Sequence, residues 1–294
     1  MTLNFLPFPI EQLTDPDAIA LAKSIEQRDI FTPLSQQPIA TTYVHQSAAG
    51  TPVLLLHGFD SSVLEFRRLL PLLAVQQDTW AIDLLGFGFT DRSPKIPLNP
   101  DTIKTHLYAC WQTLINRPVV LVGASMGGAA AIDFALTYPE VVEKLVLIDS
   151  AGFTSGPALG KFLVPPLGNL AAGILQSPKV RQQICRNAYH DPDLLTFDDQ
   201  LCGSLHLQAS GWKQALIAFT RSGGYPSFKD QLSQLQLPTL ILWGESDRIL
   251  GTKDAGAFKG AIAQSQLIWI PRCGHLPHLE QSQLTAQHIL DFLS

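Results

Sequence analysis

The sequence RPVVLVGASMGGAAAIDFAL, residues 117–136, gives the strongest indication of the fold. The apolar run Val119–Val122 stops at Gly123, and small residues with helix-forming character follow Gly128. This pattern is typical of a buried strand that turns at once into a helix. Ser125 stands at the turn, so it is either the N-cap of the helix or a side chain that the sharp bend holds out from the sheet.

Further short apolar runs, rich in leucine and β-branched residues, lie on both sides of this stretch. Runs of this length without polar alternation are typical of strands that a parallel sheet buries on both faces. Segments with helical spacing separate the runs, as at 63–73 and 102–115, and a last helix is expected at 282–293. The alternation predicts an α/β fold with a mostly parallel central sheet flanked by helices. The predicted strands begin at Pro52, Thr79, Pro118, Lys144, Thr239 and Gln266.

The alternation is interrupted between residues 153 and 228. There, apolar helical segments and Gly/Pro breaks replace the strand runs. We expect residues 153–228 to form a helical cap inserted over the carboxyl edge of the sheet. Residues 41–152 and 229–294 would then form the α/β core, and residues 1–40 an N-terminal extension that packs on this core.

Polar residues at the ends of the predicted strands suit nucleophilic catalysis. Gly123-Ala-Ser125-Met-Gly127 is a complete G-x-S-x-G, in which glycine avoids the clashes of a sharp turn that exposes the serine. A serine hydroxyl is a weak nucleophile and needs a base that a carboxylate orients. His275 follows the last predicted strand and Asp247 follows the strand before it. We therefore predict a catalytic triad of Ser125, His275 and Asp247.

Two residues compete for roles in this triad. His278 lies three positions after His275, and Asp149 ends the predicted strand that begins at Lys144. His275 is the favoured base because it comes directly after a strand and a glycine. Asp247 is the favoured acid, with Asp149 as the alternative one strand earlier.

Acyl transfer also needs N–H donors for a developing oxyanion. Met126, at the start of the helix, supplies one backbone N–H in this prediction. The sequence His57-Gly58-Phe59 follows the first predicted strand and places the N–H of Phe59 beside it. We expect His57 to form hydrogen bonds within its loop rather than to carry a proton. Gly58 joins Gly123 and Gly127 as the motif glycines.

Together these motifs resemble the α/β-hydrolase fold superfamily, in its serine-nucleophile branch with a helical cap. The resemblance covers the chain from about Thr41 to the C-terminus, apart from the insertion. It implies the fold and the Ser-His-Asp arrangement, but it leaves the substrate open because this fold serves many chemistries. Ser125 argues against the dehalogenases and epoxide hydrolases of similar layout, which use an aspartate. The lipase-type H-G-G-G is replaced here by His57-Gly58-Phe59-Asp60.

The predicted function is hydrolysis of a carboxylic ester through an acyl-enzyme, with neither a metal nor an organic cofactor. The same triad could instead cleave a C–C bond, a thioester or a lactone, or act as a cofactor-free perhydrolase. A non-catalytic receptor that binds a small molecule is the alternative from another class. The apolar cap favours a hydrophobic or lipid-like small-molecule substrate. Candidate pocket residues, each of which could equally be ordinary packing, are Phe153, Phe162, Trp212 and Phe219.

The composition limits which binding partners and which cellular compartment are expected for the protein. The net charge is −5 and no long basic run occurs, which argues against a nucleic-acid partner. The four cysteines are scattered without a C-x-x-C pair, as expected for free thiols in a cytoplasmic protein. The N-terminal sequence does not look like a secretory signal. The apolar stretch 162–175 is interrupted by prolines and is shorter than the roughly 20 residues that span a bilayer, so we expect at most weak membrane-surface contact through the cap.

Overall fold

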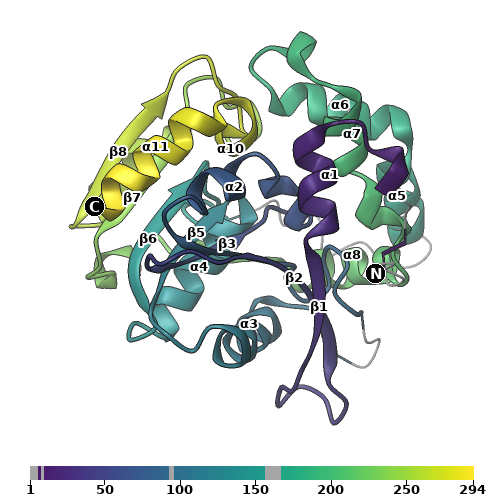
Figure 1. Cartoon of the computed structure of the whole chain (residues 1–294), viewed down its shortest axis with the longest axis horizontal. Coiled ribbons are helices and arrows are strands. Elements are labelled where there is room, and N and C mark those ends of the chain that lie inside the picture. The colour runs from purple at the N-terminus through teal and green to yellow at the C-terminus, as the bar shows by residue number, and fades with distance from the viewer. Residues whose placement is uncertain (1–5, 8–9, 93–95, 156–166) are drawn as a thin grey trace.

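The computed structural model in Figure 1 describes residues 6–7, 10–92, 96–155 and 167–294, and an eight-stranded sheet forms its centre. The strand order is β1-β2-β4-β3-β5-β6-β7-β8. Strands β3 to β8 run parallel, whereas β2 pairs antiparallel with both β1 and β4. The predicted α/β class with a mostly parallel sheet is confirmed. The strands are β1 (Ile25–Ile30), β2 (Ile39–Gln46), β3 (Pro52–Leu56), β4 (Asp78–Ile82), β5 (Val119–Ala124), β6 (Val142–Ile148), β7 (Thr239–Gly244) and β8 (Ser265–Ile270).

Helices flank the sheet and follow its strands along the chain. Short 3₁₀ helices occur at Ile10–Gln12 (η1), Val63–Phe66 (η2), Pro192–Leu194 (η4), Leu205–Gln208 (η5) and Leu232–Gln234 (η6). The α-helices are α1 (Pro16–Lys23), α2 (Leu69–Leu73), α3 (Pro100–Leu114), α4 (Met126–Thr137), α5 (Leu167–Gln176), α6 (Pro178–Ala188), α7 (Phe197–Cys202), α8 (Trp212–Ser222), α9 (Lys253–Ala261), α10 (Pro277–Glu280) and α11 (Ser282–Leu293).

The central strands are buried on both faces, which explains their continuous apolar runs. In β3, Leu54 and Leu56 belong to one hydrophobic cluster, and Val53 and Leu55 belong to another. Successive side chains of a strand point to opposite faces, so the two clusters lie on opposite sides of the sheet. Residues of α3, α4 and α9 pack in the first cluster, and residues of α1, α2 and α11 pack in the second.

The antiparallel hairpin β1–β2 extends the sheet beyond the strands that the sequence predicts. Residues 25–30 fall in the segment expected to be an N-terminal extension, and they form the edge strand β1. Strand β2 continues the sheet at residues 39–46. Only the two end residues of β1 are buried, so its sequence lacks the apolar run of a central strand.

The chain between β6 and β7 contains helices α5 to α8, which Figure 1 shows gathered at one side of the molecule beside α1. Among the described residues of this segment no strand occurs. We call residues 167–222 the helical insertion. Asp198 of α7 ties it to the N-terminal region, because its carboxylate accepts hydrogen bonds from Thr14 and from the backbone N–H of Asp15. Across the described ranges, each helix is too short or too polar to cross a membrane.

Candidate active site

Ser125 lies at the sharp turn between β5 and α4. Its backbone has φ 52° and ψ −118°, a conformation that side-chain-bearing residues rarely adopt. A Cβ on Gly123 would lie 2.3 Å from Gly127 O, and a Cβ on Gly127 would lie 2.0 Å from Leu56 O. Both contacts are prohibitively short, so the turn at Ser125 can form only with glycine on either side.

The loop after β3 passes directly beside Ser125. A Cβ on Gly58 would lie 3.4 Å from the Cβ of Ser125, so the backbone of this loop approaches the serine closely. Met126 begins helix α4, whose first N–H groups have no acceptor within the helix. The positive end of the helix dipole lies at the same place. Phe59 and Met126 thus stand on the two segments that meet at Ser125.

Buried hydrogen bonds fix the loop after β3. His57 Nδ1 lies 2.8 Å from Gly58 O, and His57 Nε2 accepts the N–H of Leu84 at 3.1 Å. The Nδ1 atom therefore carries the proton and donates it. Burial lowers the pKa of His57, which keeps the ring neutral. One ring nitrogen bonds within the loop after β3 and the other bonds to the loop after β4, so His57 holds the two loops together.

His278, the rival base, is buried beside the carboxylate of Glu65, with 3.1 Å between His278 Nε2 and Glu65 Oε1. Glu65 in turn accepts the backbone N–H of Gly58 at 3.1 Å. Burial alone would raise the pKa of Glu65, but the hydrogen bond and charge of His278 outweigh it and lower the pKa to about 2. His278 and Glu65 thus support the loop.

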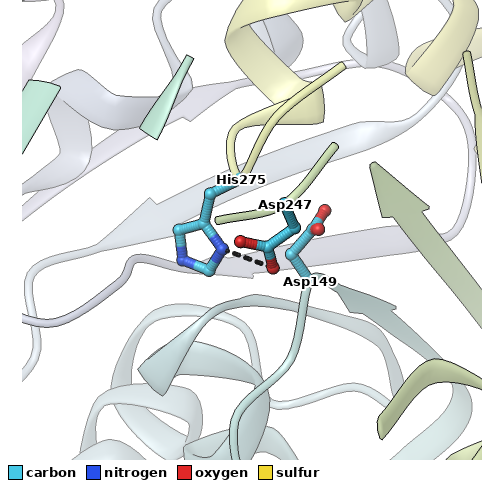
Figure 2. Close-up of side chains that lie close together, drawn as sticks. All are labelled: Asp149, Asp247 and His275. Carbon is cyan, nitrogen blue, oxygen red and sulfur yellow. Dashed lines mark hydrogen bonds and ion pairs between the residues drawn. The ribbon is translucent and has the colours of Figure 1, made fainter. Parts of the chain in front are cut away.

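His275 and Asp247 form a buried pair. The distance from His275 Nδ1 to Asp247 Oδ2 is 3.0 Å, and Figure 2 shows Asp247 between His275 and Asp149. The other carboxylate oxygen of Asp247 accepts the N–H groups of Ile249 at 2.7 Å and Leu250 at 3.1 Å. Burial would raise the pKa of Asp247, but His275 and these N–H groups together lower it. Asp247 is therefore a charged acceptor that orients the imidazole.

The backbone around His275 is held from two sides. Its N–H donates to Ala188 O, at the end of α6 in the helical insertion, at 2.7 Å. Glu280 accepts the N–H groups of Gly274 at 2.9 Å and of His190 at 2.7 Å. The position of the ring therefore depends on contacts from α10 and from the helical insertion.

Asp149, the rival acid, follows β6 and is fully buried. Its carboxyl oxygens accept the N–H of Gly244 at 3.1 and 3.3 Å. Two effects raise the pKa of Asp149 well above its ordinary value. The larger is burial, and the next is the negative charge of the neighbouring Asp247. Asp149, Asp247 and His275 each offer a ligand atom within 4.8 Å of the others. A metal would need both carboxylates ionised, whereas a neutral Asp149 beside a charged Asp247 fits a chain of hydrogen bonds ending at His275.

Ser125 and His275 line one cavity of about 260 Å³. Apolar side chains from the loops and the helical insertion form most of its wall, and the charged residues Asp60, Glu65, Arg67, Arg181 and Asp199 also line it. The apolar lining consists of Phe59, Ile184, Ala188, Ile249, Leu276 and Leu279. The cavity wall, within the part of the chain that the structure describes, includes neither His278 nor Asp149.

The aromatic residues expected in a pocket occupy different places. Phe153 packs against Phe258, and Phe219 packs against the rings of Phe59 and Phe87. Neither is among the described residues that line the cavity. Trp212 is likewise absent from that lining, and its Nε1 bonds to Asp60. Phe162 lies outside the described residues.

Residues 51–282 match the family profile described as alpha/beta hydrolase fold. The chain belongs to the α/β-hydrolase family. The resemblance inferred from the sequence motifs is therefore confirmed.

Several hydrolases are similar to the chain over most of its length. The alpha/beta hydrolase domain-containing protein VTE7 of Arabidopsis thaliana is 35% identical, covering 99% of this chain and 90% of the relative. The 2-hydroxy-6-oxo-2,4-heptadienoate hydrolase of Pseudomonas putida is 27% identical, and the match covers 86% of this chain and 92% of the relative. Lipase 1 of Psychrobacter immobilis is 27% identical, and the match covers 84% of this chain and 78% of the relative. A solved serine hydrolase involved in carbazole degradation, CarC, superposes with a TM-score of 0.75 at 25% identity, with 92% and 98% covered.

Sequence reasoning missed the carboxylates that support the site of this α/β hydrolase. Asp60, Glu65 and Glu280 are buried or partly buried acceptors behind the loops of Ser125 and His275. A signal was present for Glu280, which ends the segment GHLPHLE that begins next to His275. Asp60 follows Phe59 directly, but its partners lie more than 120 positions away in the sequence.

Proposed function

We propose that the protein is a serine hydrolase that cleaves a carboxylic ester through an acyl-enzyme, acting in the cytoplasm. The observation that carries the proposal is the shared cavity of Ser125 and His275, in which His275 is hydrogen bonded to the charged Asp247. A nucleophile, a base and an orienting acid in this relation activate a hydroxyl. The strained turn at Ser125 supports the same reading, because strain of this kind concentrates at functional sites.

The mechanism follows from these positions. Ser125 Oγ attacks the acyl carbon while His275 Nε2 takes its proton, and Asp247 holds the imidazole through Nδ1. The carbonyl oxygen becomes an oxyanion that accepts the backbone N–H groups of Phe59 and Met126. His275 then protonates the leaving alcohol. It next accepts a proton from a water molecule that hydrolyses the acyl-enzyme, which returns Ser125 to its hydroxyl form.

The substrate class follows from the wall of the cavity. Aliphatic side chains of the helical insertion and of the loop after β8 face the same space as Ser125. Burial of an apolar acyl or alcohol group against them is favourable by about 25 cal/mol per Å². The similarity to Lipase 1 points to an ester with an apolar group as well.

A second candidate activity is cleavage of a C–C bond next to a carbonyl by the same three residues. The observation that favours it is the similarity to the 2-hydroxy-6-oxo-2,4-heptadienoate hydrolase, which extends over 86% of this chain. A panel of p-nitrophenyl esters, thioesters, lactones and vinylogous 1,5-diketones separates the two. Turnover of the diketones at 100-fold higher kcat/KM than the esters would favour the second candidate.

Labelling by a fluorophosphonate tests the nucleophile. The wild type should form a covalent adduct at Ser125 and lose esterase activity in proportion, whereas Ser125→Ala should form none. Ser150→Ala is a matched control, because Ser150 lies on the neighbouring loop after β6 and does not line the cavity. An unlabelled wild type that still binds apolar esters would indicate a receptor, and equal labelling of Ser125→Ala would place the nucleophile elsewhere.

A further inference from the structure

The buried residue Asp60 connects the loop after β3, which carries the proposed oxyanion donor Phe59, to the helical insertion. Its Oδ1 accepts the indole N–H of Trp212 at 2.7 Å and lies 3.0 Å from His206 Nε2. Its Oδ2 accepts a guanidinium N–H of Arg181 at 2.7 Å. These partners come from α8, η5 and α6, so three separate elements of the insertion converge on one carboxylate. Arg181 also donates to Gly203 O within the insertion.

The location of Asp60 matters because it directly follows Phe59. Its backbone has φ 52°, in the left-handed region that aspartate tolerates at some cost. Asp60 is 7% exposed. Burial would raise the pKa of Asp60, but His206, Arg181 and Trp212 outweigh it and lower that pKa. A charged, buried carboxylate fixed by three donors leaves the adjoining peptide little freedom.

We propose that Asp60 is a positioning residue that orients the backbone N–H of Phe59 towards the oxyanion. This orientation depends on the contacts of Asp60 with the helical insertion. The proposal rests on the ester hydrolysis proposed above. The insertion then has two roles. It contributes apolar side chains to the wall of the cavity, and through its contacts with Asp60 it holds the oxyanion donor Phe59 in place. The His275 loop is held likewise, through Ala188 O and through His190. Both the donor and the base are therefore in place only with the insertion seated.

The test compares ligands that differ only in forming an oxyanion. Ser125 Oγ adds to the carbonyl carbon of an alkyl trifluoromethyl ketone. The Oγ proton passes to His275, and the electron pair of the C=O π bond moves to the oxygen, which becomes the oxyanion. The corresponding trifluoromethyl carbinol fills the same cavity without adding. In Asp60→Asn, at least one donor loses its acceptor and meets an N–H group instead. We expect affinity for the ketone to fall about tenfold or more and kcat to fall with it. Affinity for the carbinol and KM should change about twofold or less.

Asp198→Asn is the matched control. Asp198 is also a buried carboxylate that ties the insertion to the rest of the molecule, but it bonds to Thr14 and Asp15, away from Phe59. The ratio of ketone to carbinol affinity should stay at the wild-type value in this variant. Trp212→Phe keeps an aromatic ring and removes the N–H that Asp60 accepts. It should lower the same ratio by a smaller factor, and it provides the test if Asp60→Asn does not fold.

The outcomes separate the two proposals. A wild type that binds the ketone no more tightly than the carbinol overturns the proposed hydrolysis and the positioning role with it. When the wild type discriminates, an unchanged ratio in Asp60→Asn and Trp212→Phe overturns the positioning role alone. Equal losses of ketone and carbinol affinity also overturn it, because Asp60 would then shape only the cavity. The same shift in Asp198→Asn would trace the effect to general loosening of the insertion.

Discussion

At the scale of single residues, Asp149 and Asp247 differ in charge although they lie side by side. Asp247 accepts hydrogen bonds from His275 and from two backbone N–H groups, which favours its ionised form. Asp149 is buried against that charge, which favours its neutral form. Two adjacent carboxylates cannot both ionise at low cost, so the pair titrates as a unit and the negative charge rests on Asp247.

This difference in charge predicts unequal effects of removing each carboxylate. Asp247→Asn should lower kcat for p-nitrophenyl esters by roughly 10⁴-fold, because an amide cannot stabilise the imidazolium or hold the productive tautomer of His275. Asp149→Asn replaces a neutral carboxyl with a neutral amide of the same shape and should lower kcat by about tenfold or less. Steady-state kinetics on both purified variants checks the expectation. A larger loss in Asp149→Asn would make Asp149 the orienting acid.

The residues predicted from the sequence as a triad are those whose positions follow from strand ends. Ser125, Asp247 and His275 each come a few positions after a strand, and parallel strands bring these ends to one edge of the sheet. The carboxylates of Asp60 and Glu65 follow no such rule. Asp60 bonds to side chains 121 to 152 positions away, and sequence periodicity carries no information on contacts of that range.

At the scale of elements, the junction between β5 and α4 leaves no space for side chains at two of its glycines. Helix α4 begins so close to β3 that Gly127 has no room for a methyl group against Leu56 O. Other helices have such room, as at Gly256 of α9, where no atom lies within 4 Å of an added Cβ. Replacement of glycine by alanine is therefore expected to affect stability in opposite directions in the two helices.

Alanine substitution should reveal this contrast. Gly127→Ala should lower the free energy of unfolding by about 3 kcal/mol or more, because backbone of β3 or α4 must move. Gly256→Ala should raise it by about 0.5–1 kcal/mol, since alanine loses less backbone entropy in a helix. Urea unfolding followed by circular dichroism measures both. Two changes of the same sign would contradict the steric account of the junction.

The strand predictions are accurate where a strand is buried on both faces and its sequence is therefore an unbroken apolar run. The runs that start at Pro52, Pro118 and Thr239 form β3, β5 and β7, each of which begins within one residue of the predicted start. Strand β1 was not predicted because its sequence, IEQRDI, is polar at every position except the ends. An edge strand pairs through backbone on one side only, so its side chains need not be apolar.

At the scale of the whole molecule, buried carboxylates connect parts of the chain that are distant in sequence. Asp60 joins the loop after β3 to the helical insertion, and Asp198 joins the insertion to the N-terminal region. Asp199 pairs with the buried guanidinium of Arg67. Burial raises the pKa of each of these carboxyls, and their partners lower it below the ordinary value. Glu65 follows the same pattern. Protonation of these groups therefore weakens the folded state as a whole.

Acid should unfold the protein through these carboxyls, and Glu65 allows a direct check. Its pKa is about 2 in the folded state and 4.5 otherwise, so its contribution is fully present above about pH 4.5 and is lost as the pH falls towards 2. The loss is about 3 kcal/mol by this account. Glu65→Gln should flatten the fall of unfolding free energy between pH 4.5 and 2. The exposed Glu143→Gln should leave the slope unchanged, and an unchanged slope in Glu65→Gln would refute the assignment.

The polar sequence of β1 also affects whether the sheets of two molecules can pair through their edge strands. In the part of the chain that the structure describes, strand β1 ends the sheet, and one row of its backbone N–H and C=O groups has no neighbouring strand. If two such edges paired antiparallel about their centres, Glu26 of each copy would lie opposite Asp29 of the other. Like charges directly opposed across strands are destabilising, and they would occur twice. The edge therefore resists continuation into an intermolecular sheet, which protects the folded protein from aggregation at high concentration.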